Sequence, residues 1–400
     1  MPNEILQTQG QINNINFASL NGMFYIQGSE SLTLSEKQQL LKEISVYDFI
    51  EYAELECPHV TSSIISVSEQ PNDNETPDFT KLQEYKLSKG QFWTGIDMEY
   101  DWSLGVTGKG IRIADIEAAF NYQHINLKRD SFIPLAISDD VGEHEINHST
   151  AVAGAMYAKD IGFGVKGMVH DADTLYGISV IPYNAASGII RGLQHLRTDD
   201  IFIYESSIHA KPDDEATQVP ADYCKSVWDI TKTATDAGII IIAAAGNGGE
   251  NLNDDYYAEY RNRGDNCAVR VWVEALKIKY VAHFLPMAKI MIHVQGWGDS
   301  VVTTGFGTLY NGGPNNNYAS NFDGTSAATP IVASAAIAIQ SWYKQQTGKV
   351  LTPREIRSLL IETGTPQRPD FINGHIGPLP NGIYVIRLMN YNDVCNNKAV

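Results

Sequence analysis

Four short, largely apolar runs recur along the chain after residue 110, and stretches of helical character separate them. The runs cover residues 111–116, 174–180, 200–204 and 239–245. A strand that is apolar along its length is buried on both faces, which is typical of parallel sheets covered by helices. The pattern therefore predicts an α/β fold with a parallel sheet and helices on both faces. The helices are expected over residues 150–159, 185–196, 221–237, 327–346 and 353–362.

The first 80 residues differ from the rest in charge. They contain 12 acidic and 2 basic side chains, whereas the whole chain has a net charge of −18. The polar, proline-containing stretch 66–77 is the expected boundary. We therefore expect two units: residues 1–75, a small α+β module with its acidic linker, and residues 76–400. Within the first unit, strands are expected over residues 23–27 and 49–55, with a helix over residues 34–44.

Charge and hydropathy exclude several classes of protein. A net charge of −18 argues against a nucleic-acid binder that neutralises phosphates. The longest apolar runs, 237–245 and 331–339, are too short to span a membrane. The first residues carry an acid and no apolar run, so no signal peptide is indicated. A cytoplasmic location is expected, with secretion by another route as the alternative. The four scattered cysteines are expected to be buried thiols.

The strongest local motif is Asp-Gly-Thr-Ser-Ala-Ala-Thr-Pro at residues 323–330, followed by small apolar residues. It places Ser326 at a glycine turn with a helix directly behind it, where the helix N-terminus stabilises developing negative charge. Pro330 is compatible with the first turn of that helix. Taken alone, the motif is also typical of an ordinary N-cap serine before a buried helix.

Three further segments favour a catalytic interpretation. His148 precedes a small-residue helical stretch, Asn247 follows the most apolar strand, and residues 108–117 form a strand that ends in a carboxylate. Acid, histidine, asparagine and serine in this order resemble the subtilisin-like serine peptidases, or subtilases, over residues 80–385. The resemblance implies the subtilisin-like fold and the hydrolysis of peptide bonds.

The resemblance also implies a role for each of these residues. Ser326 would be the nucleophile and His148 the general base, while the Asn247 amide and the Ser326 backbone N–H would hold the oxyanion. Alignment places Glu117 where the family usually has an aspartate, which would make this a subgroup trait. Asp115, two residues earlier on the same strand face, is the alternative. Catalytic groups gather at the carboxyl ends of parallel strands, which favours Glu117.

Substrate-binding and metal-binding residues are less clearly indicated. The resemblance places Ala244, Ala245 and Gly246 on one wall of the primary specificity pocket, and Glu205 and Ser206 near the opposite wall. Glu205 would either attract a basic P1 residue or pair structurally. A calcium loop around residues 251–257 is not indicated, because two acids are too few, and no metal or cofactor is expected.

Residues 15–57 resemble the inhibitory propeptide of the family. The leading hypothesis is a serine endopeptidase made as a proenzyme that cleaves its own linker, with a protein or peptide substrate and the propeptide in cis as partners. Neither nucleic acid nor membrane is expected as a partner. The alternatives are a peptide ligase or macrocyclase, a maturation protease that removes leader peptides, and a catalytically dead protein that binds peptides.

Overall fold

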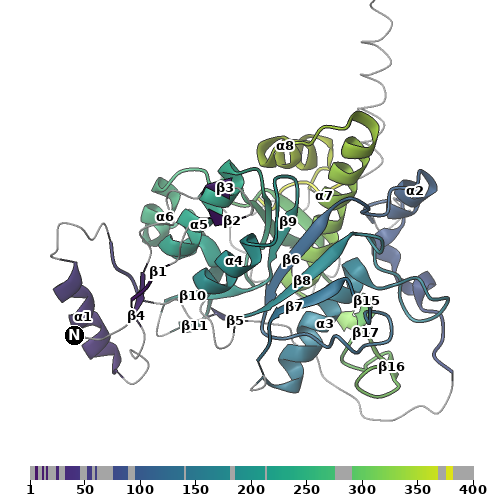
Figure 1. The fold of residues 1–400 in the computed structure, drawn as a ribbon, viewed down its shortest axis with the longest axis horizontal. Helices are drawn as coiled ribbons and strands as arrows, with labels where there is room; N and C mark the ends of the chain where they lie inside the picture. The colour runs from purple at the N-terminus through teal and green to yellow at the C-terminus, as the bar shows by residue number, and fades with distance from the viewer. Residues whose placement is uncertain are drawn as a thin grey trace, which may run out of the picture.

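The computed structural model describes most of the chain from residue 75 onward and short parts before it. The described residues are 5–7, 11–12, 15–16, 24–26, 32–45, 52–55, 59–60, 75–88, 95–138, 141–180, 185–211, 214–274, 291–367 and 375–381. At its centre is a seven-stranded sheet with the order β14-β13-β12-β9-β6-β8-β7, in which all neighbours are parallel (Figure 1). The strands are β6 (Arg112–Glu117), β7 (Phe132–Ala136), β8 (Thr174–Ser179), β9 (Ile201–Tyr204), β12 (Ile240–Ala244), β13 (Val269–Glu274) and β14 (Val294–Trp297). The predicted parallel α/β fold is confirmed.

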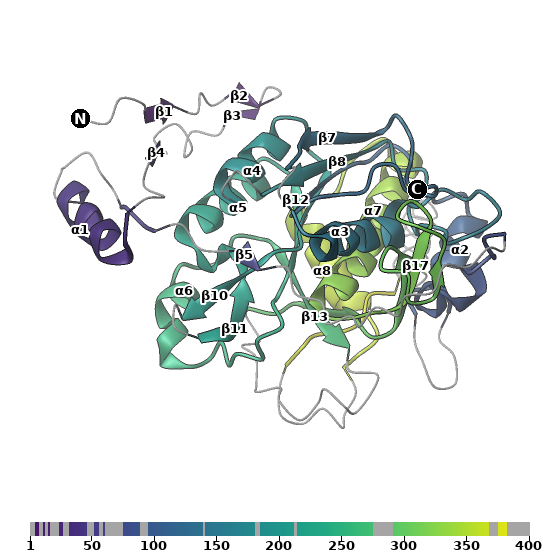
Figure 2. The same cartoon turned by 90° about the horizontal axis from the view of Figure 1, so that it is seen from below.

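Helices cover both faces of the sheet (Figures 1 and 2). Helices α3 (Glu143–Tyr157), α7 (Thr325–Thr347) and α8 (Pro353–Thr363) contribute to one apolar core, and α4 (Ala185–Leu193) and α5 (Lys225–Asp236) to the other. Along β6, Ile113 belongs to the first core, whereas Ala114 and Ile116 belong to the second. This alternation follows from the two-residue period of a strand. The same alternation determines toward which face of the sheet each polar residue of β6 points.

Smaller elements surround the sheet. The 3-10 helices η3 (Thr80–Leu82) and η4 (Glu84–Lys86) and helix α2 (Met98–Ser103) precede its first strand. The 3-10 helices η5 (Ala221–Tyr223) and η6 (Asp255–Tyr257) and helix α6 (Ala258–Asn262) lie in its connections. Strands β15 (Val301–Thr304), β17 (Asn317–Phe322) and β16 (Tyr310–Asn311) form an antiparallel sheet in that order. Strands β11 (Asp214–Pro220), β10 (Ser207–Lys211) and β5 (His59–Val60) form another. None of the helices in the described ranges has the length and apolar character needed to cross a bilayer.

Helix α7 is the most buried helix of the described fold, with Thr325 to Trp342 all inaccessible to solvent. It begins directly after Gly324, whose φ of 96° belongs to the left-handed region that favours glycine. Because the helix begins at Thr325, Pro330 lies in its second turn, and the prediction of a first-turn proline is wrong. Pro330 has no N–H to offer the carbonyl of Ser326 four residues earlier.

The described N-terminal residues include β1 (Ile5–Gln7) paired with β4 (Phe24–Ile26), and β2 (Gln11–Ile12) paired with β3 (Ile15–Asn16). Helix α1 (Leu34–Ile44) matches the predicted helix, and a capping box between Thr33 and Glu36 starts it. The predicted strand 49–55 is wrong in its described part, because residues 52–55 are not in a strand. Residues 49–51 lie outside the described part.

Residues 52–55 and 59–60 contact the larger, C-terminal part of the chain at two places. The carboxylate of Glu54 accepts the backbone N–H groups of Lys225 and Ser226, at 3.1 and 2.8 Å, and so caps the N-terminus of α5. The Tyr52 hydroxyl donates to Asp229 on the same helix at 2.7 Å. Strand β5 pairs with β10, with Val60 opposite Ser207. A carboxylate at a helix N-terminus satisfies N–H groups that otherwise have no partner within the helix.

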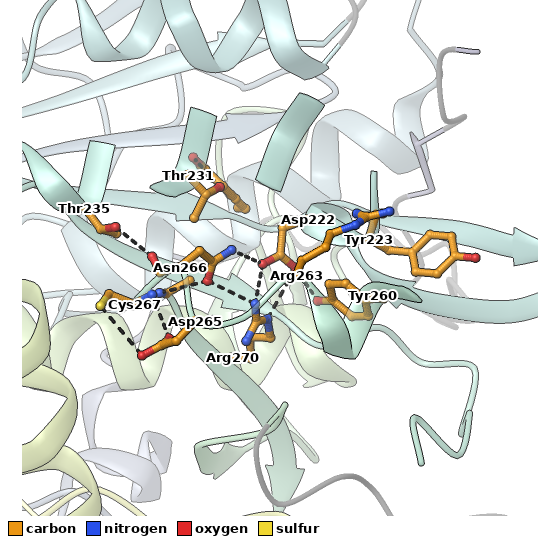
Figure 3. Close-up of polar contacts among 12 residues, drawn as sticks. Asp222, Tyr223, Thr231, Thr235, Tyr260, Arg263, Asp265, Asn266, Cys267 and Arg270 are labelled. Atoms are coloured by element: carbon orange, nitrogen blue, oxygen red, sulfur yellow. Dashed lines mark hydrogen bonds and ion pairs between the residues drawn. The ribbon is translucent and has the colours of Figure 1, made fainter. Parts of the chain in front are cut away.

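A buried polar cluster connects η5, α6 and β13 (Figure 3). Arg270 forms an ion pair with Asp222 at 2.5 Å, and Asp222 also accepts hydrogen bonds from Tyr260 and Asn266. Burial acts to raise the pKa of the Asp222 carboxyl, but Arg270 and these hydrogen bonds hold that pKa below its usual value. The opposite charges of Asp222 and Arg270 therefore neutralise each other, and hydrogen bonds satisfy several polar atoms of the cluster.

The cysteines only partly follow the prediction of buried thiols. Cys224, the N-cap residue of α5, is disulfide-bonded. Cys267 is a free thiol and only partly buried. Cys57 and Cys395 lie outside the described residues.

Candidate active site

An acid and a histidine meet at the carboxyl end of the central strand. Glu117 is the last residue of β6, and His148 lies on α3, which packs against the same face of the sheet. Nδ1 of His148 is 3.2 Å from Oε1 of Glu117, and neither side chain is exposed to solvent. The sequence predicted His148 at the start of its helix, but α3 begins at Glu143 and His148 is in its second turn.

Ser326 is the second residue of α7, in the first turn after Gly324. The ring of Phe322, four residues before it, packs edge-on against the ring of His148, with centroids 5.5 Å apart and an interplanar angle of 79°. This contact places the segment that leads into α7 beside the histidine. Backbone N–H groups in the first turn of a helix have no partner within the helix, so they are available to an oxyanion. This is a suitable position for a nucleophile whose attack creates negative charge on the carbonyl oxygen of the substrate.

Asn247 lies just beyond β12 and contacts the start of α7. Its Oδ1 accepts the backbone N–H and the hydroxyl of Thr325, at 2.9 and 3.0 Å. Its backbone N–H donates to Gln218 at 3.2 Å. A Cβ atom added to Gly324 would lie 3.2 Å from Nδ2 of Asn247. With Oδ1 held by Thr325, the amide nitrogen lies on the other branch of the side chain, close to the turn that carries Ser326.

The described domain contains the four predicted catalytic residues in the predicted order, on a sheet of the predicted type. The sequence pattern of the subtilase family matches residues 108–377 of the chain. The chain belongs to the subtilase family. Residues 108–377 are therefore a serine-peptidase domain, and they include every strand of the central sheet.

Three subtilases illustrate the similarity. Alkaline elastase YaB of Bacillus sp. (strain YaB) is 30% identical over 255 residues, which are 61% of this chain and 59% of that protein. The major intracellular serine protease of Bacillus subtilis (strain 168) is 25% identical over 275 residues, 66% of this chain and 79% of that protein. Subtilisin BL of Lederbergia lenta is 28% identical over 251 residues, 60% of this chain and 82% of that protein.

The two predicted walls of the specificity pocket lie at the carboxyl ends of adjacent strands of this subtilase, β9 and β12. Ala243 of β12 is opposite Tyr204 of β9, so Ala244 and Glu205 follow side by side. Ala245 and Ser206 are both buried. Gly246 has a φ of 89°, and a Cβ atom there would lie 2.9 Å from the backbone of Gln218. A glycine is required at this position by both conformation and space.

Glu205 lies near Glu117, the candidate acid of the site. Its side chain is buried, and burial together with the nearby Glu117 and Asp115 raises the pKa of its carboxyl well above the usual value. Burial and Glu117 raise the pKa of Asp115 in the same direction. Selection of a basic P1 residue by Glu205 stays a prediction.

The segment considered for calcium has a structural role in the described part of the chain. Oδ1 of Asp254 accepts the backbone N–H of Tyr256 at 2.9 Å, which caps η6. Within the described ranges, no group of three or more histidine, cysteine, aspartate or glutamate side chains is arranged to hold a metal ion.

Thr325 is a site residue that the sequence did not assign. It was visible only as the residue before Ser326 in the glycine-turn motif. Its two hydrogen bonds to Asn247 join the end of β12 to the start of α7, a contact between segments almost 80 residues apart in the sequence. No local pattern predicts such a pairing.

Proposed function

We propose that this subtilase is a serine endopeptidase that hydrolyses peptide bonds through an acyl-enzyme on Ser326. The observation that carries the proposal is the buried approach of Glu117 to His148 beside the segment that leads into α7. His148 accepts the Ser326 proton during attack on the scissile carbonyl and returns it to the leaving amine. Glu117 orients the ring and stabilises the imidazolium. Asn247 Nδ2 and the Ser326 N–H hold the oxyanion.

Glu117, rather than Asp115, is proposed as the acid of the triad. A glutamate is one methylene longer than the aspartate usual in the family, and its Oε1 still comes within 3.2 Å of His148. Asp115 lies two residues further back, which is roughly 6.6 Å along a strand. The longer side chain at the end of β6 is therefore compatible with catalysis.

The N-terminal residues 1–75 are proposed to act as an inhibitory propeptide in cis. Two contacts support this role: Glu54 caps α5, and β5 adds a strand to β10 directly after Glu205 and Ser206. An extended peptide that pairs with a sheet edge is a common mode of peptide recognition. A segment bound there competes with substrate for the strand beside the pocket walls. Self-cleavage in the linker 66–77 would release it.

No cofactor is proposed, because nucleophile, base and oxyanion donors all come from the chain. We also propose an intracellular location, which is supported by the similarity to the major intracellular serine protease of Bacillus subtilis. Immunodetection in fractionated cells of the source organism tests it, and recovery of the protein only from the medium would contradict it.

A fluorophosphonate probe tests the nucleophile. We expect labelling of the wild type after removal of residues 1–75, and none of Ser326→Ala. Ser334→Ala is the matched control, because Ser334 lies on the same helix and its hydroxyl donates to Pro330. Labelling of Ser326→Ala would contradict the assignment. A folded, unlabelled wild type would instead support the catalytically dead alternative.

Processing and product masses test the reaction. Full-length Ser326→Ala should stay intact while the wild type is cut in the linker. Equal processing of both would exclude self-cleavage. With a peptide substrate, products lighter by one water than the hydrolysed peptide would favour the ligase or macrocyclase over the hydrolase.

A further inference from the structure

Three carboxyl groups cluster on one face of the sheet behind the proposed catalytic histidine. Asp115 and Glu117 of β6 share a face with Ile113, because residues two apart in a strand point the same way. Asp115 is opposite Ile203 on β9, so Glu205, two residues further on, follows opposite Glu117. Ile113 and Ile203 belong to the core formed with α3 and α7. All three carboxyl groups therefore face the side of the sheet where His148 lies.

Little compensates the charge of this cluster. Apart from the 3.2 Å approach of Glu117 to His148, the six carboxyl oxygens of the three acids have no hydrogen-bond partner among the described residues. The neighbouring strand β12 contributes only isoleucine and alanine. The first turn of α7 contributes threonine, serine and alanine. Among the described residues, Glu117 and Asp115 on β6 are the titratable groups whose charges act on Glu205. His148 on α3 approaches Glu117, and the hydroxyl of Tyr122 lies near Asp115.

Three ionised carboxylates with one histidine would leave two buried negative charges unpaired, at a cost of several kcal/mol per ion. Two of the acids are therefore expected to hold a proton at neutral pH. Glu117 is the one that approaches His148, and burial together with the charge of Glu117 raises the pKa values of Asp115 and Glu205. The proton-bearing acids are thus Asp115 and Glu205. A carboxylic acid next to a carboxylate is a hydrogen-bond donor.

We propose that Glu205 is a positioning residue, which in its protonated form donates a hydrogen bond to the Glu117 carboxylate and holds that carboxylate against His148. The inference rests on the proposed peptidase function and deepens it. It also gives Glu205 a role other than selection of a basic P1 residue, since a neutral acid does not attract a cation.

Asp115 has a different neighbourhood. It lies opposite Gly177 on β8, and a Cβ atom at Gly177 would lie 2.4 Å from the hydroxyl of Tyr122. The missing side chain at Gly177 leaves room for this hydroxyl beside Asp115. Glu205, which directly neighbours Glu117 across the strands, is therefore the donor that the register favours.

A melting comparison in the Ser326→Ala background tests the protonation of Glu205 without requiring activity. A buried acid that keeps its proton while the unfolded chain loses it makes stability fall as pH rises. Glu205→Gln removes this pH-dependent loss of stability. The melting temperature of the variant minus that of the Ser326→Ala parent should therefore increase from pH 5 to pH 8. Glu362→Gln, an exposed substitution on α8, should show no such trend. An unfolded Glu205→Gln protein, or a difference independent of pH, would overturn the proposal.

Kinetics of the processed enzyme test the positioning. Glu205→Leu should lower kcat about 10- to 100-fold, the range for a hydrogen bond to a charged group, with little change in KM. Glu205→Gln keeps a donor and should recover most of that loss. Equal losses in both variants, or a rise in KM confined to substrates with Arg or Lys at P1, would overturn it. An inactive wild type would contradict the proposed peptidase, whereas the melting comparison would still report on Glu205.

Discussion

Glu117 and His148 approach to 3.2 Å at the carboxyl end of β6, and both side chains are completely buried. The pair brings a strand and a helix into contact at the end of the central sheet where the candidate catalytic residues lie. If Glu117 takes the place of the family's aspartate, as proposed, the site has to accommodate one more methylene. The 3.2 Å approach is compatible with that longer side chain.

Substitution of the two candidate acids should separate their roles. Glu117→Gln should lower kcat about 10⁴-fold, because a neutral amide cannot stabilise the imidazolium of His148. Asp115→Asn should cost less than about tenfold, since Asp115 is not the group at 3.2 Å. Steady-state hydrolysis of a chromogenic peptide measures both effects. A larger loss for Asp115→Asn would make Asp115 the acid of the triad.

Removal of the Asn247 amide should slow the chemical step and leave substrate binding intact. Asn247→Ala is expected to lower kcat by about 10² to 10³, the cost of one oxyanion donor, with KM unchanged. Thr325→Val removes only one of the two hydrogen bonds that hold Oδ1 and should lower kcat less than about tenfold. Kinetics with kcat and KM resolved test this. A change confined to KM would contradict an oxyanion role.

Loss of the carboxylate at the α5 terminus should loosen the N-terminal segment. In full-length Ser326→Ala, Glu54→Gln is expected to lower the free energy of unfolding by about 1 to 2 kcal/mol, because two helix N–H groups lose a charged acceptor. Glu43→Gln, on the exposed helix α1, is the control and should change it by less than about 0.5 kcal/mol. Chemical denaturation measures both. Equal effects would show that the α5 contact contributes nothing specific.

A buried histidine should make the protein sensitive to acid. Burial lowers the pKa of His124 to about 4, and its Nε2 lies 2.9 Å from the carbonyl of Asn317. The unfolded chain takes up a proton near pH 6.5, so stability is complete above that pH and falls as pH drops toward 4, by about 3 kcal/mol. His124→Gln in the Ser326→Ala background should lack this part of the acid dependence. Denaturant midpoints at pH 7 and pH 4.5 test it, and parallel losses in both proteins would contradict it.

The Asp222 and Arg270 pair should behave as a buried, mutually dependent unit (Figure 3). Arg270→Met leaves the Asp222 carboxylate buried without its cation and should destabilise the fold by about 3 to 5 kcal/mol. The double variant Asp222→Asn with Arg270→Met removes both charges and should be less destabilised than the single variant. Urea denaturation of both proteins provides the comparison. An additive double variant would show that the two side chains act independently.

Four of the seven strands of the central sheet were predictable because their sequences are largely apolar. Strands β6, β8, β9 and β12 lie within about one residue of the predicted runs. Strand β11 was not predicted, because its sequence Asp-Glu-Ala-Thr-Gln-Val-Pro is mostly polar and its pairing is with a hairpin neighbour. The first turns of α3 were missed for a similar reason, since residues 143–147 lack an apolar stripe.

The candidate catalytic residues were predictable from local motifs, whereas their surroundings were not. Glu117, His148, Asn247 and Ser326 each lie in a short segment with a recognisable glycine or small-residue context. The proximity of Glu205 to Glu117 depends on the pairing of β6 with β9, two strands separated by β7 and β8 in the sequence. The parallel register between two such strands depends on the packing of the whole sheet, so the sequence of either segment alone does not predict it.

The depth of α7 has a consequence for the order of events during synthesis. The helix that carries Ser326 packs against α3 and against β12, β13 and β14, and it emerges from the ribosome after every strand of the central sheet. Contacts between residues so far apart in sequence form late in folding. A nascent chain therefore carries the histidine and its acid for some 180 residues of elongation without a nucleophile. Until α7 is in place, the growing polypeptide therefore lacks the nucleophile that the proposed self-cleavage requires.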